Sequence, residues 1–526
     1  MTRNANSFFQ KLLPGSTSVG TGAIVLLLIM VVIGAVLPTE FQQITQQARD
    51  YITYSLGWYY LLLVTGIVGF CLFFIISPMG DIRLGEPGTK PEYSKTSWLA
   101  MLFSAGMGIG LVFFGAAEPL SHYAIAAPNG EVGSQAALAD ALRYSFFHWG
   151  IHAWSVYAII ALSLAYFKFR KKERGLLSVT LKPLFLQWTE RLPGKAIDMV
   201  CLIATAIGVA TTLGFGAVQI NSGLSYLFGL PENFHIQFII ILAATVCFLA
   251  SAITGVDRGI QLLSNINVLL ALLLLVVVLA VGPTVHIMNA FVDTVGAYFQ
   301  QFIRMSFRTA AFNPVHHEWI EKWTIFYWAW WLSWAPFVGT FIARISKGRT
   351  IREFLTHVML IPTLFSFLWF SVFGILAVDA YDLHPELAQL TAEQILFGVF
   401  NSYSLGITLS IVAVFLIFCF FITSADSATH VLAMLSENGV LTPHTRTKVV
   451  WGALIAAISV ILLAAGGLGA LQNMLMIIAL PFSVVIILMM IALYIEVRHE
   501  QKEMGLYLKP EQYPEKGSPF RSYEDM

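Results

Sequence analysis

Apolar segments about 20 residues long recur along nearly the whole chain, and they restrict its fold more than any other feature. A helix of about 20 apolar residues is long enough to cross a bilayer. Of the 526 residues, 57% are hydrophobic and 11% are charged, whereas a soluble domain carries about 25% charged residues. The sequence therefore predicts an all-α integral membrane protein. Twelve transmembrane helices are expected, with cores near residues 18–37, 54–77, 97–117, 139–166, 196–228, 234–254, 261–283, 323–343, 354–378, 402–424, 447–466 and 471–495.

The basic residues between these segments predict how the chain is oriented. Lysine and arginine concentrate in the loops on the cytoplasmic side of a membrane protein. If both termini are cytoplasmic, most of the 30 lysines and arginines fall on that side, with dense groups at residues 167–175 and 343–349. We therefore expect a multi-pass protein of the plasma (inner) membrane with two cytoplasmic termini.

Charge and cysteine content exclude other kinds of partner. The formal net charge is zero, which argues against nucleic acid. The four cysteines all lie inside apolar segments, where they act as small hydrophobic residues and not as a disulfide or metal framework. They are Cys71, Cys201, Cys247 and Cys419. No organic cofactor is expected.

Residues 286–308 predict an amphipathic helix along the outer interface, because apolar residues recur there every three or four positions among polar ones. Five spans precede this helix in one unit and five follow it in another. Since an odd number of crossings reverses direction, the two units form the inverted repeat of many secondary transporters. The predicted divisions are 1–96 (tail and two peripheral helices), 97–285 (first repeat), 286–316 (interfacial helix and loop), 317–496 (second repeat) and 497–526 (short cytoplasmic tail).

The first helix of each predicted repeat carries helix-breaking residues. The stretch SAGMGIGLVFFG contains Gly106, Gly108 and Gly110, and each glycine costs about 1 kcal/mol in a helix interior relative to alanine. The stretch WAWWLSWAPFVG contains Pro336, which removes an intrahelical hydrogen bond. We expect both helices to be broken here. Matching interruptions in two halves point to a substrate site near the membrane midplane.

Tryptophans cluster in the same stretch of the second repeat. The face of a desolvated tryptophan attracts a cation by about 2 kcal/mol or more, so a broken, aromatic helix suits a quaternary ammonium ligand. A crowded contact between helices explains the same residues, and this stretch alone does not decide between the two. The residues concerned are Trp328, Trp330, Trp331 and Trp334.

The fourth span adds the stretch FFHWGIHAWSVY, with Trp149, Trp154 and Tyr157. On an ideal helix Trp149 lies about 140° from Trp154, so all three rings converge only if the helix is irregular or the cavity is wide. His148 and His152 are spaced like a metal-binding pair. No accompanying Glu motif is present, and packing is the favoured interpretation of these histidines.

The tenth predicted span ends in the stretch FCFFITSADSATH. There Thr423 and Ser424, with Phe420 one turn earlier, place two hydroxyls at the end of an apolar helix. Hydroxyl and carbonyl oxygens suit a hard cation such as sodium. Serine and threonine also bond back to the preceding turn of their own helix. The spacing alone favours that second interpretation.

The stretches SAGMGIGL, HWGIHAW and WAWWLSWAPFVG together resemble the betaine/choline/carnitine transporter family, and the similarity extends over nearly the whole chain. The resemblance implies two peripheral helices followed by ten helices of the leucine-transporter fold, and a homotrimer. It also implies uptake of trimethylammonium zwitterions and related compatible solutes for osmoprotection. A secondary transporter of this kind is not an enzyme.

The resemblance also implies the site residues. The family's aromatic box matches Trp149, Trp154, Tyr157 and Trp331, and positions used in substrate passage or gating match Phe326, Trp330 and Trp334. The glycine stretch is expected to contact substrate through Gly106, Gly108 and Gly110. A sodium site of sodium-coupled members matches Met107 and Phe420 through their backbones, and Thr423 and Ser424, which reverses the preference stated above for these hydroxyls.

Three departures from the family pattern refine this expectation. A second sodium site needs two threonines one turn apart, but Thr205 is followed by Val209, so a second sodium is not expected. The tail after Val497 is short and carries no excess of basic residues, which argues against osmosensing through the tail. Members that take choline often carry an acidic residue where this chain has Gly110, which favours a zwitterionic substrate.

Three functional readings follow from the sequence. The first is a sodium-coupled symporter for a solute such as glycine betaine. The second is a substrate/product exchanger or a proton-coupled choline or carnitine transporter of the same fold. The third is an intramembrane enzyme or channel, for which neither a pair of carboxylates nor a continuous polar stripe is present in the spans.

Overall fold

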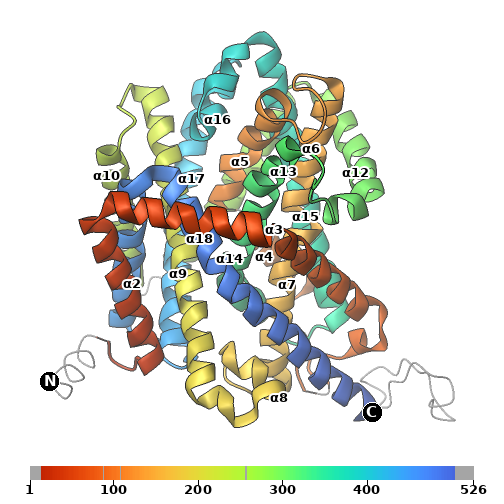
Figure 1. The fold of residues 1–526 in the computed structure, drawn as a ribbon, viewed down its shortest axis with the longest axis vertical. Coiled ribbons are helices and arrows are strands. Elements are labelled where there is room, and N and C mark those ends of the chain that lie inside the picture. The colour runs from red at the N-terminus through yellow and green to blue at the C-terminus, as the bar shows by residue number, and fades with distance from the viewer. Residues whose placement is uncertain (1–12, 87, 107, 255–256, 504–526) are drawn as a thin grey trace.

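The computed structural model describes residues 13–86, 88–106, 108–254 and 257–503 (Figure 1). These residues are almost entirely helical, and the one β-bridge among them joins Arg83 to Thr350. Nine of the described helices are long and apolar enough to cross a membrane, or ten if the bent pair Lys95–Ser104 and Ile109–Ile125 counts as one span. The predicted fold class, an all-α multi-pass membrane protein, is confirmed at this level.

The helices follow the predicted segments closely. The first half of the chain forms α2 (Ser18–Val36), α3 (Pro38–Ile76), α4 (Lys95–Gly106), α5 (Ile109–Leu120), α6 (Gln135–Trp149), α7 (Ile151–Ala165), α8 (Lys182–Phe185), α9 (Leu192–Phe228), α10 (Phe234–Thr254) and α11 (Asp257–Val281). The second half forms α12 (Thr284–Ser306), α13 (Pro314–Ile320), α14 (Phe326–Ile345), α15 (Ile351–Leu383), α16 (Ala392–Asn401), α17 (Gly406–Ser436) and α18 (Thr445–Glu503).

The predicted break in the glycine stretch is present. Helix α4 ends at Gly106 and α5 begins at Ile109, and the two helices are inclined to one another by 61°. Gly108 has an extended backbone conformation (φ −168°, ψ 175°) immediately before α5. The first N–H groups of α5 therefore lie at the break, where a helix leaves its N-terminal donors without intrahelical partners.

The predicted break at Pro336 is wrong. Pro336 lies inside the continuous helix α14, and the irregular part of this span is a π-helical turn that precedes it at Glu321–Ile325. Helix α14 is buried along most of its length and packs against α7, α9 and α18 (Figure 1). Close packing on several sides holds the proline-containing turn in helical form, as transmembrane helices often tolerate proline.

Two further differences concern the ends of helices. Helix α17 continues to Ser436, so Thr423 and Ser424 lie within it and not at its end as predicted. The sequence did not predict the short helix α16, which begins with a capping box at Thr391 and Gln394. The last two predicted spans are the two arms of α18, which is interrupted by non-helical conformations at Gly466 and Gly467.

Helix α12 matches the predicted amphipathic segment. It buries Ile287, Tyr298 and Met305 and packs against α6 and α15, at the edge of the molecule in Figure 1. The division of the chain into two repeats stays a prediction, and of the predicted tail only residues 497–503, the end of α18, are described.

Candidate functional site

The rings of three aromatic residues from another part of the chain surround the ring of Trp331. Its ring centroid lies 5.3 Å from that of Trp149, 6.2 Å from that of Trp154 and 5.1 Å from that of Tyr157. The rings of Trp154 and Tyr157 are 5.4 Å apart and almost perpendicular. Because the ring planes cross at steep angles, the rings form the walls of a box and not a stack.

The break between α6 and α7 allows this convergence. Helix α6 ends at Trp149, α7 begins at Ile151, and Gly150 between them has φ −98° and ψ −142°, outside the helical region. A side chain at Gly150 would place its Cβ 2.4 Å from the carbonyl oxygen of Phe146. Trp149 and Trp154 therefore stand on separate helices, and the irregularity that the sequence required is present.

The four rings line one cavity together with residues from the break between α4 and α5. Gly108, Gly110, Trp330 and Trp334 also line it, as do Ile109, Leu111, Thr212, Val338 and Ser424. Gly106 is the last residue of α4, at the edge of the break. The cavity thus contains an aromatic wall and the N-terminal end of α5.

Gly110 brings α5 against this wall. A Cβ at this position would lie 2.6 Å from Trp330 Cη2 and 3.0 Å from Trp149 Cη2. Only glycine fits without displacing the two indoles, because a Cβ contact below 3.0 Å forces one of the partners to move. An acidic residue at Gly110 would require a different arrangement of these rings.

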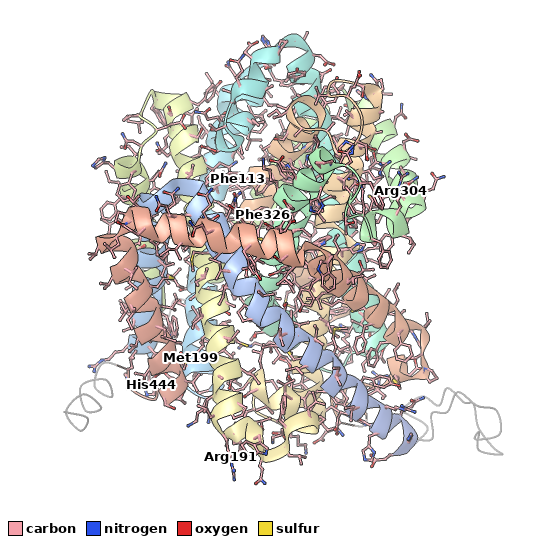
Figure 2. All side chains as sticks on the ribbon, viewed as in Figure 1. Phe113, Arg191, Met199, Arg304, Phe326 and His444 are labelled. Atoms are coloured by element: carbon pink, nitrogen blue, oxygen red, sulfur yellow. The ribbon has the colours of Figure 1, made fainter. Side chains whose placement is uncertain are left out.

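Phe326 belongs to a different cavity. It lies with Phe113, Phe114 and Trp323 beside charged residues such as Glu318 and Lys322. The Phe326 ring contacts that of Trp330 at 5.8 Å. Figure 2 shows Phe326 and Phe113 in the upper half of the molecule, away from Arg191 and His444 at the lower end. Phe326 therefore lies between the box cavity and a cavity that contains charged residues from the predicted outer loops.

The predicted sodium residues Phe420, Thr423 and Ser424 line a third cavity with three further serines and Asn267. The Thr423 hydroxyl donates to the Cys419 carbonyl at 3.1 Å and accepts from Asn267 Nδ2 at 3.1 Å. Ser424 also borders the aromatic cavity. Met107, the remaining predicted ligand, lies outside the described residues, so the structure assembles three of the four.

Thr205 is engaged in a local bond. Its hydroxyl donates to the Cys201 carbonyl at 2.8 Å on the same helix, and its side chain is fully buried. Threonine commonly makes such a bond to the preceding turn of its own helix. It agrees with the absence of a second threonine at Val209.

The sequence profile described as "BCCT, betaine/carnitine/choline family transporter" matches residues 18–502. The chain belongs to this family. It is accordingly a membrane transporter and not an enzyme.

Several similar proteins of the betaine/carnitine/choline family are also named as transporters. The chain is 53% identical over 472 residues to the "Glycine betaine transporter OpuD" of Bacillus subtilis (strain 168), covering 90% of this chain and 92% of the relative. It is 43% identical over 467 residues to the "Ectoine/hydroxyectoine transporter" of Virgibacillus pantothenticus, covering 88% and 92%. A "Glycine betaine transporter" of Acinetobacter baylyi is 40% identical over 477 residues, covering 90% and 72%.

The sequence analysis did not predict that Glu118 would lie near the aromatic box. The carboxylate of Glu118 is fully buried and lies against His148 and Trp149. The sequence places Glu118 near the end of a span, eight residues after Gly110 and with no second carboxylate nearby. The useful signal was an acidic residue inside an apolar segment, since such residues commonly mark a functional site. His148 and His152 have separate partners, since His148 contacts Glu118 and Thr324 whereas His152 contacts Ser306.

Proposed function

We propose that the protein imports a betaine-like zwitterionic compatible solute, with glycine betaine as the first candidate. The observation that carries this proposal is the box of Trp149, Trp154, Tyr157 and Trp331, whose crossed rings surround a cavity. Aromatic cages of this kind bind quaternary ammonium groups through cation–π attraction. The relatives named for glycine betaine and ectoine transport support the same class of substrate.

The same cavity contains a feature that suits the carboxylate of a zwitterionic substrate. Gly108, Ile109 and Gly110 line it at the N-terminal end of α5. Free backbone N–H groups and the helix dipole favour an anion at such an end. A zwitterion would place its trimethylammonium group among the rings and its carboxylate at α5. This arrangement favours glycine betaine over choline, which has no carboxylate.

Sodium is the proposed coupling ion. Phe420, Thr423 and Ser424 border one cavity, and Ser424 borders the substrate cavity as well. An ion held by these oxygens would stabilise the arrangement of α17 that closes one wall of the substrate cavity. The alternative is a substrate/product exchanger or a proton-coupled transporter of choline or carnitine.

Transport is proposed to follow alternating access in a twelve-span fold with an inverted repeat. The ten apolar spans become twelve when α14 and the second arm of α18 are added. The start of α2 and the end of α18 both lie at the lower end of Figure 1. Lys171 of the basic segment 167–175 pairs there with Glu496 of α18. These positions support two cytoplasmic termini in the plasma membrane.

A homotrimer is part of this proposal. Helix α12 buries one face against the protein, yet its other face exposes a row of apolar side chains. The row consists of Val285, Met288, Val292, Phe299 and Ile303. A neighbouring copy would cover this row where it is not in contact with lipid.

A transport assay with purified protein in liposomes tests the proposed function. Labelled glycine betaine is offered with an inward sodium gradient, and with potassium in place of sodium. The proposal expects concentrative uptake with sodium only, inhibited by ectoine and other betaines. Equal uptake with potassium contradicts sodium symport and favours the exchanger or the proton-coupled transporter. Absence of uptake under every ion gradient contradicts the proposed substrate class.

A further inference from the structure

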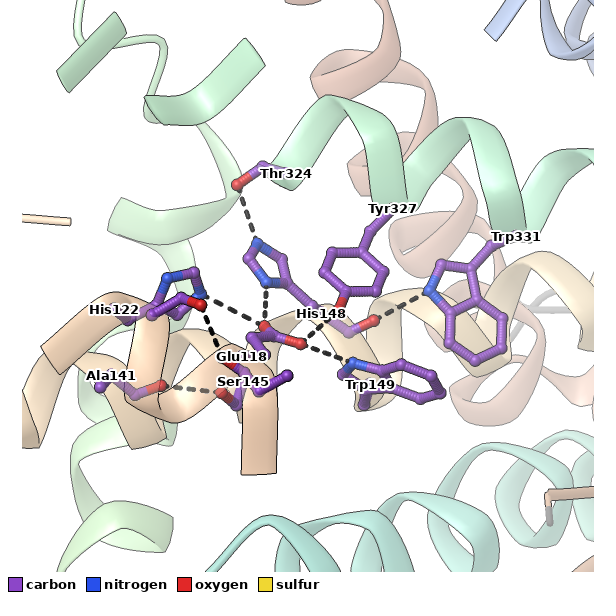
Figure 3. Close-up of polar contacts among 11 residues, drawn as sticks. Glu118, His122, Ala141, Ser145, His148, Trp149, Thr324, Tyr327 and Trp331 are labelled. Carbon is purple, nitrogen blue, oxygen red and sulfur yellow. Dashed lines mark hydrogen bonds and ion pairs between the residues drawn. The ribbon is translucent and has the colours of Figure 1, made fainter. Parts of the chain in front are cut away.

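The fully buried carboxylate of Glu118 collects hydrogen bonds from three side chains (Figure 3). His148 Nδ1 lies 2.7 Å from Oε1, and Trp149 Nε1 donates to Oε2 at 2.9 Å. The hydroxyl of Tyr327 also donates to Oε2. His122 Nε2 approaches Oε1 to 3.4 Å. Glu118 on α5 is thus tied to both α6 and α14.

The donors around Glu118 indicate its charge state. Thr324 is fully buried, and among the described residues its hydroxyl has one polar partner, His148 Nε2 at 2.9 Å. Donation to Nε2 would satisfy this buried hydroxyl, and the ring proton of a neutral His148 would then lie on Nδ1, facing Glu118. Donors then face both oxygens of Glu118, which fits an ionised carboxylate.

This negative charge lies beside two histidines, His122 and His148, and beside no lysine or arginine among the described side chains. Burying an unbalanced charge is costly, and within a membrane such a charge commonly serves a ligand or ion. The possible ligand atoms of Glu118, His122 and His148 lie within 4.8 Å of one another, but Nδ1 of His148 is engaged with Glu118 itself at 2.7 Å.

Glu118 is connected to two of the four box rings. It binds the indole N–H of Trp149 directly. The backbone carbonyl of His148, whose ring also bonds Glu118, accepts the indole N–H of Trp331 at 2.9 Å. An anionic acceptor at an indole N–H makes that ring more electron-rich, and hydrogen bonds in series polarise one another. The ring face becomes more attractive to a cation as a result.

We propose that Glu118 is a positioning residue that supplies the negative charge for substrate recognition. It holds Trp149 directly and Trp331 through His148, and its charge favours the cationic end of the substrate from behind the box. This inference rests on the proposed betaine-type function, because it assigns a role toward the trimethylammonium group. Glu118 does not itself line the aromatic cavity.

A pair of ligands of equal shape tests the role of this charge. Glycine betaine is compared with 3,3-dimethylbutanoate, in which carbon replaces the quaternary nitrogen and the cationic charge is lost. Binding of both is measured by calorimetry on the full-length protein. We expect E118Q to weaken betaine binding at least about tenfold, because hydrogen bonds to a charged group are stronger than those between neutral groups. Binding of the carbon analogue should stay the same or tighten, so the preference for betaine falls.

Two matched variants separate charge from structure. E118D keeps the charge and should preserve the preference for betaine even if both ligands bind more weakly. Tyr327→Phe removes one donor and keeps both the ring and the charge, so it should also leave the preference unchanged. An equal loss of both ligands in E118Q, or an unchanged preference, would overturn the assignment.

A measurement without ligand covers the case in which E118Q does not fold. Ultraviolet resonance Raman difference spectra between the wild-type protein and Trp149→Phe isolate the N–H band of Trp149. We expect the band of a strongly hydrogen-bonded indole, since its acceptor is an anion. The band of a weakly bonded indole would contradict the assignment. Failure of the wild-type protein to bind betaine would contradict the proposed function and leave this spectroscopic result standing.

Discussion

The indole N–H of Trp331 donates a 2.9 Å hydrogen bond to the backbone carbonyl of His148. His148 lies in the last turn of α6, where carbonyl groups lack partners within the helix because the helical conformation ends at Gly150. The break that separates Trp149 from Trp154 therefore also supplies the acceptor that fixes Trp331. Box geometry and helix irregularity arise from the same local feature, and the rings are held in place before any ligand arrives.

Replacing Trp331 with leucine should weaken substrate binding about thirtyfold while the protein remains folded. Loss of one desolvated cation–π contact costs about 2 kcal/mol, which corresponds to that change in affinity. Titration of the remaining tryptophan fluorescence with glycine betaine measures the effect. The control is Trp58→Leu, because Trp58 is 54% exposed on α3 and lies outside the box. Equal affinities for the two variants would remove Trp331 from the binding site.

Removing the hydroxyls of Thr423 and Ser424 should raise the sodium concentration needed for half-maximal uptake. The double alanine variant loses two side-chain oxygens that line the third cavity, so its affinity for betaine at saturating sodium should change much less. Thr429→Ala is the matched control, since this buried threonine on the same helix bonds the Asp426 carbonyl and does not line that cavity. An unchanged sodium dependence in the double variant would place the coupling ion elsewhere.

A methyl group at Gly110 should destabilise the protein by about 1–3 kcal/mol, as overpacking usually does. Its Cβ would lie 2.6 Å from Trp330 Cη2 and 3.0 Å from Trp149 Cη2. Gly108→Ala is the control, because no atom lies within 4 Å of its added Cβ and its backbone is extended. Thermal unfolding in detergent should show a lower Tm for Gly110→Ala than for Gly108→Ala. Equal Tm values would mean that the rings near Gly110 move freely.

Choline should compete with labelled glycine betaine at least about tenfold less effectively than unlabelled betaine does. The trimethylammonium groups are the same, but choline has no carboxylate for the N-terminal end of α5, whose interaction with an anion is worth up to about 2 kcal/mol. Competition for uptake into liposomes measures the ratio. Displacement by choline at concentrations similar to those of betaine would argue against a zwitterion-specific site.

The sequence predicted the all-α fold because apolar length is a local signal that marks a membrane helix wherever it occurs. The residues of the box were named through the family resemblance, and their role as a binding site stays a prediction. Glycine at 108 likewise predicted the break between α4 and α5, since the cost of glycine in a helix does not depend on distant partners.

Other features depended on tertiary packing, which the sequence does not display. Pro336 stays within α14 because neighbouring helices enclose it, and Thr423 lies mid-helix because α17 continues beyond its most apolar part. The role of Glu118 depends on Tyr327, more than 200 positions further along the chain, whose hydroxyl reaches the carboxylate. Phe326 faces a separate cavity although it lies only five residues before Trp331.

The central claim is that a trimethylammonium group binds in the box of Trp149, Trp154, Tyr157 and Trp331. A cryo-EM structure with glycine betaine and sodium tests it most directly. The account predicts ligand density inside the box, with the quaternary nitrogen within about 6 Å of the ring centroids and the carboxylate at the N-terminal end of α5. Density confined to the cavity beside Phe326, with the box empty at saturating betaine, would contradict it.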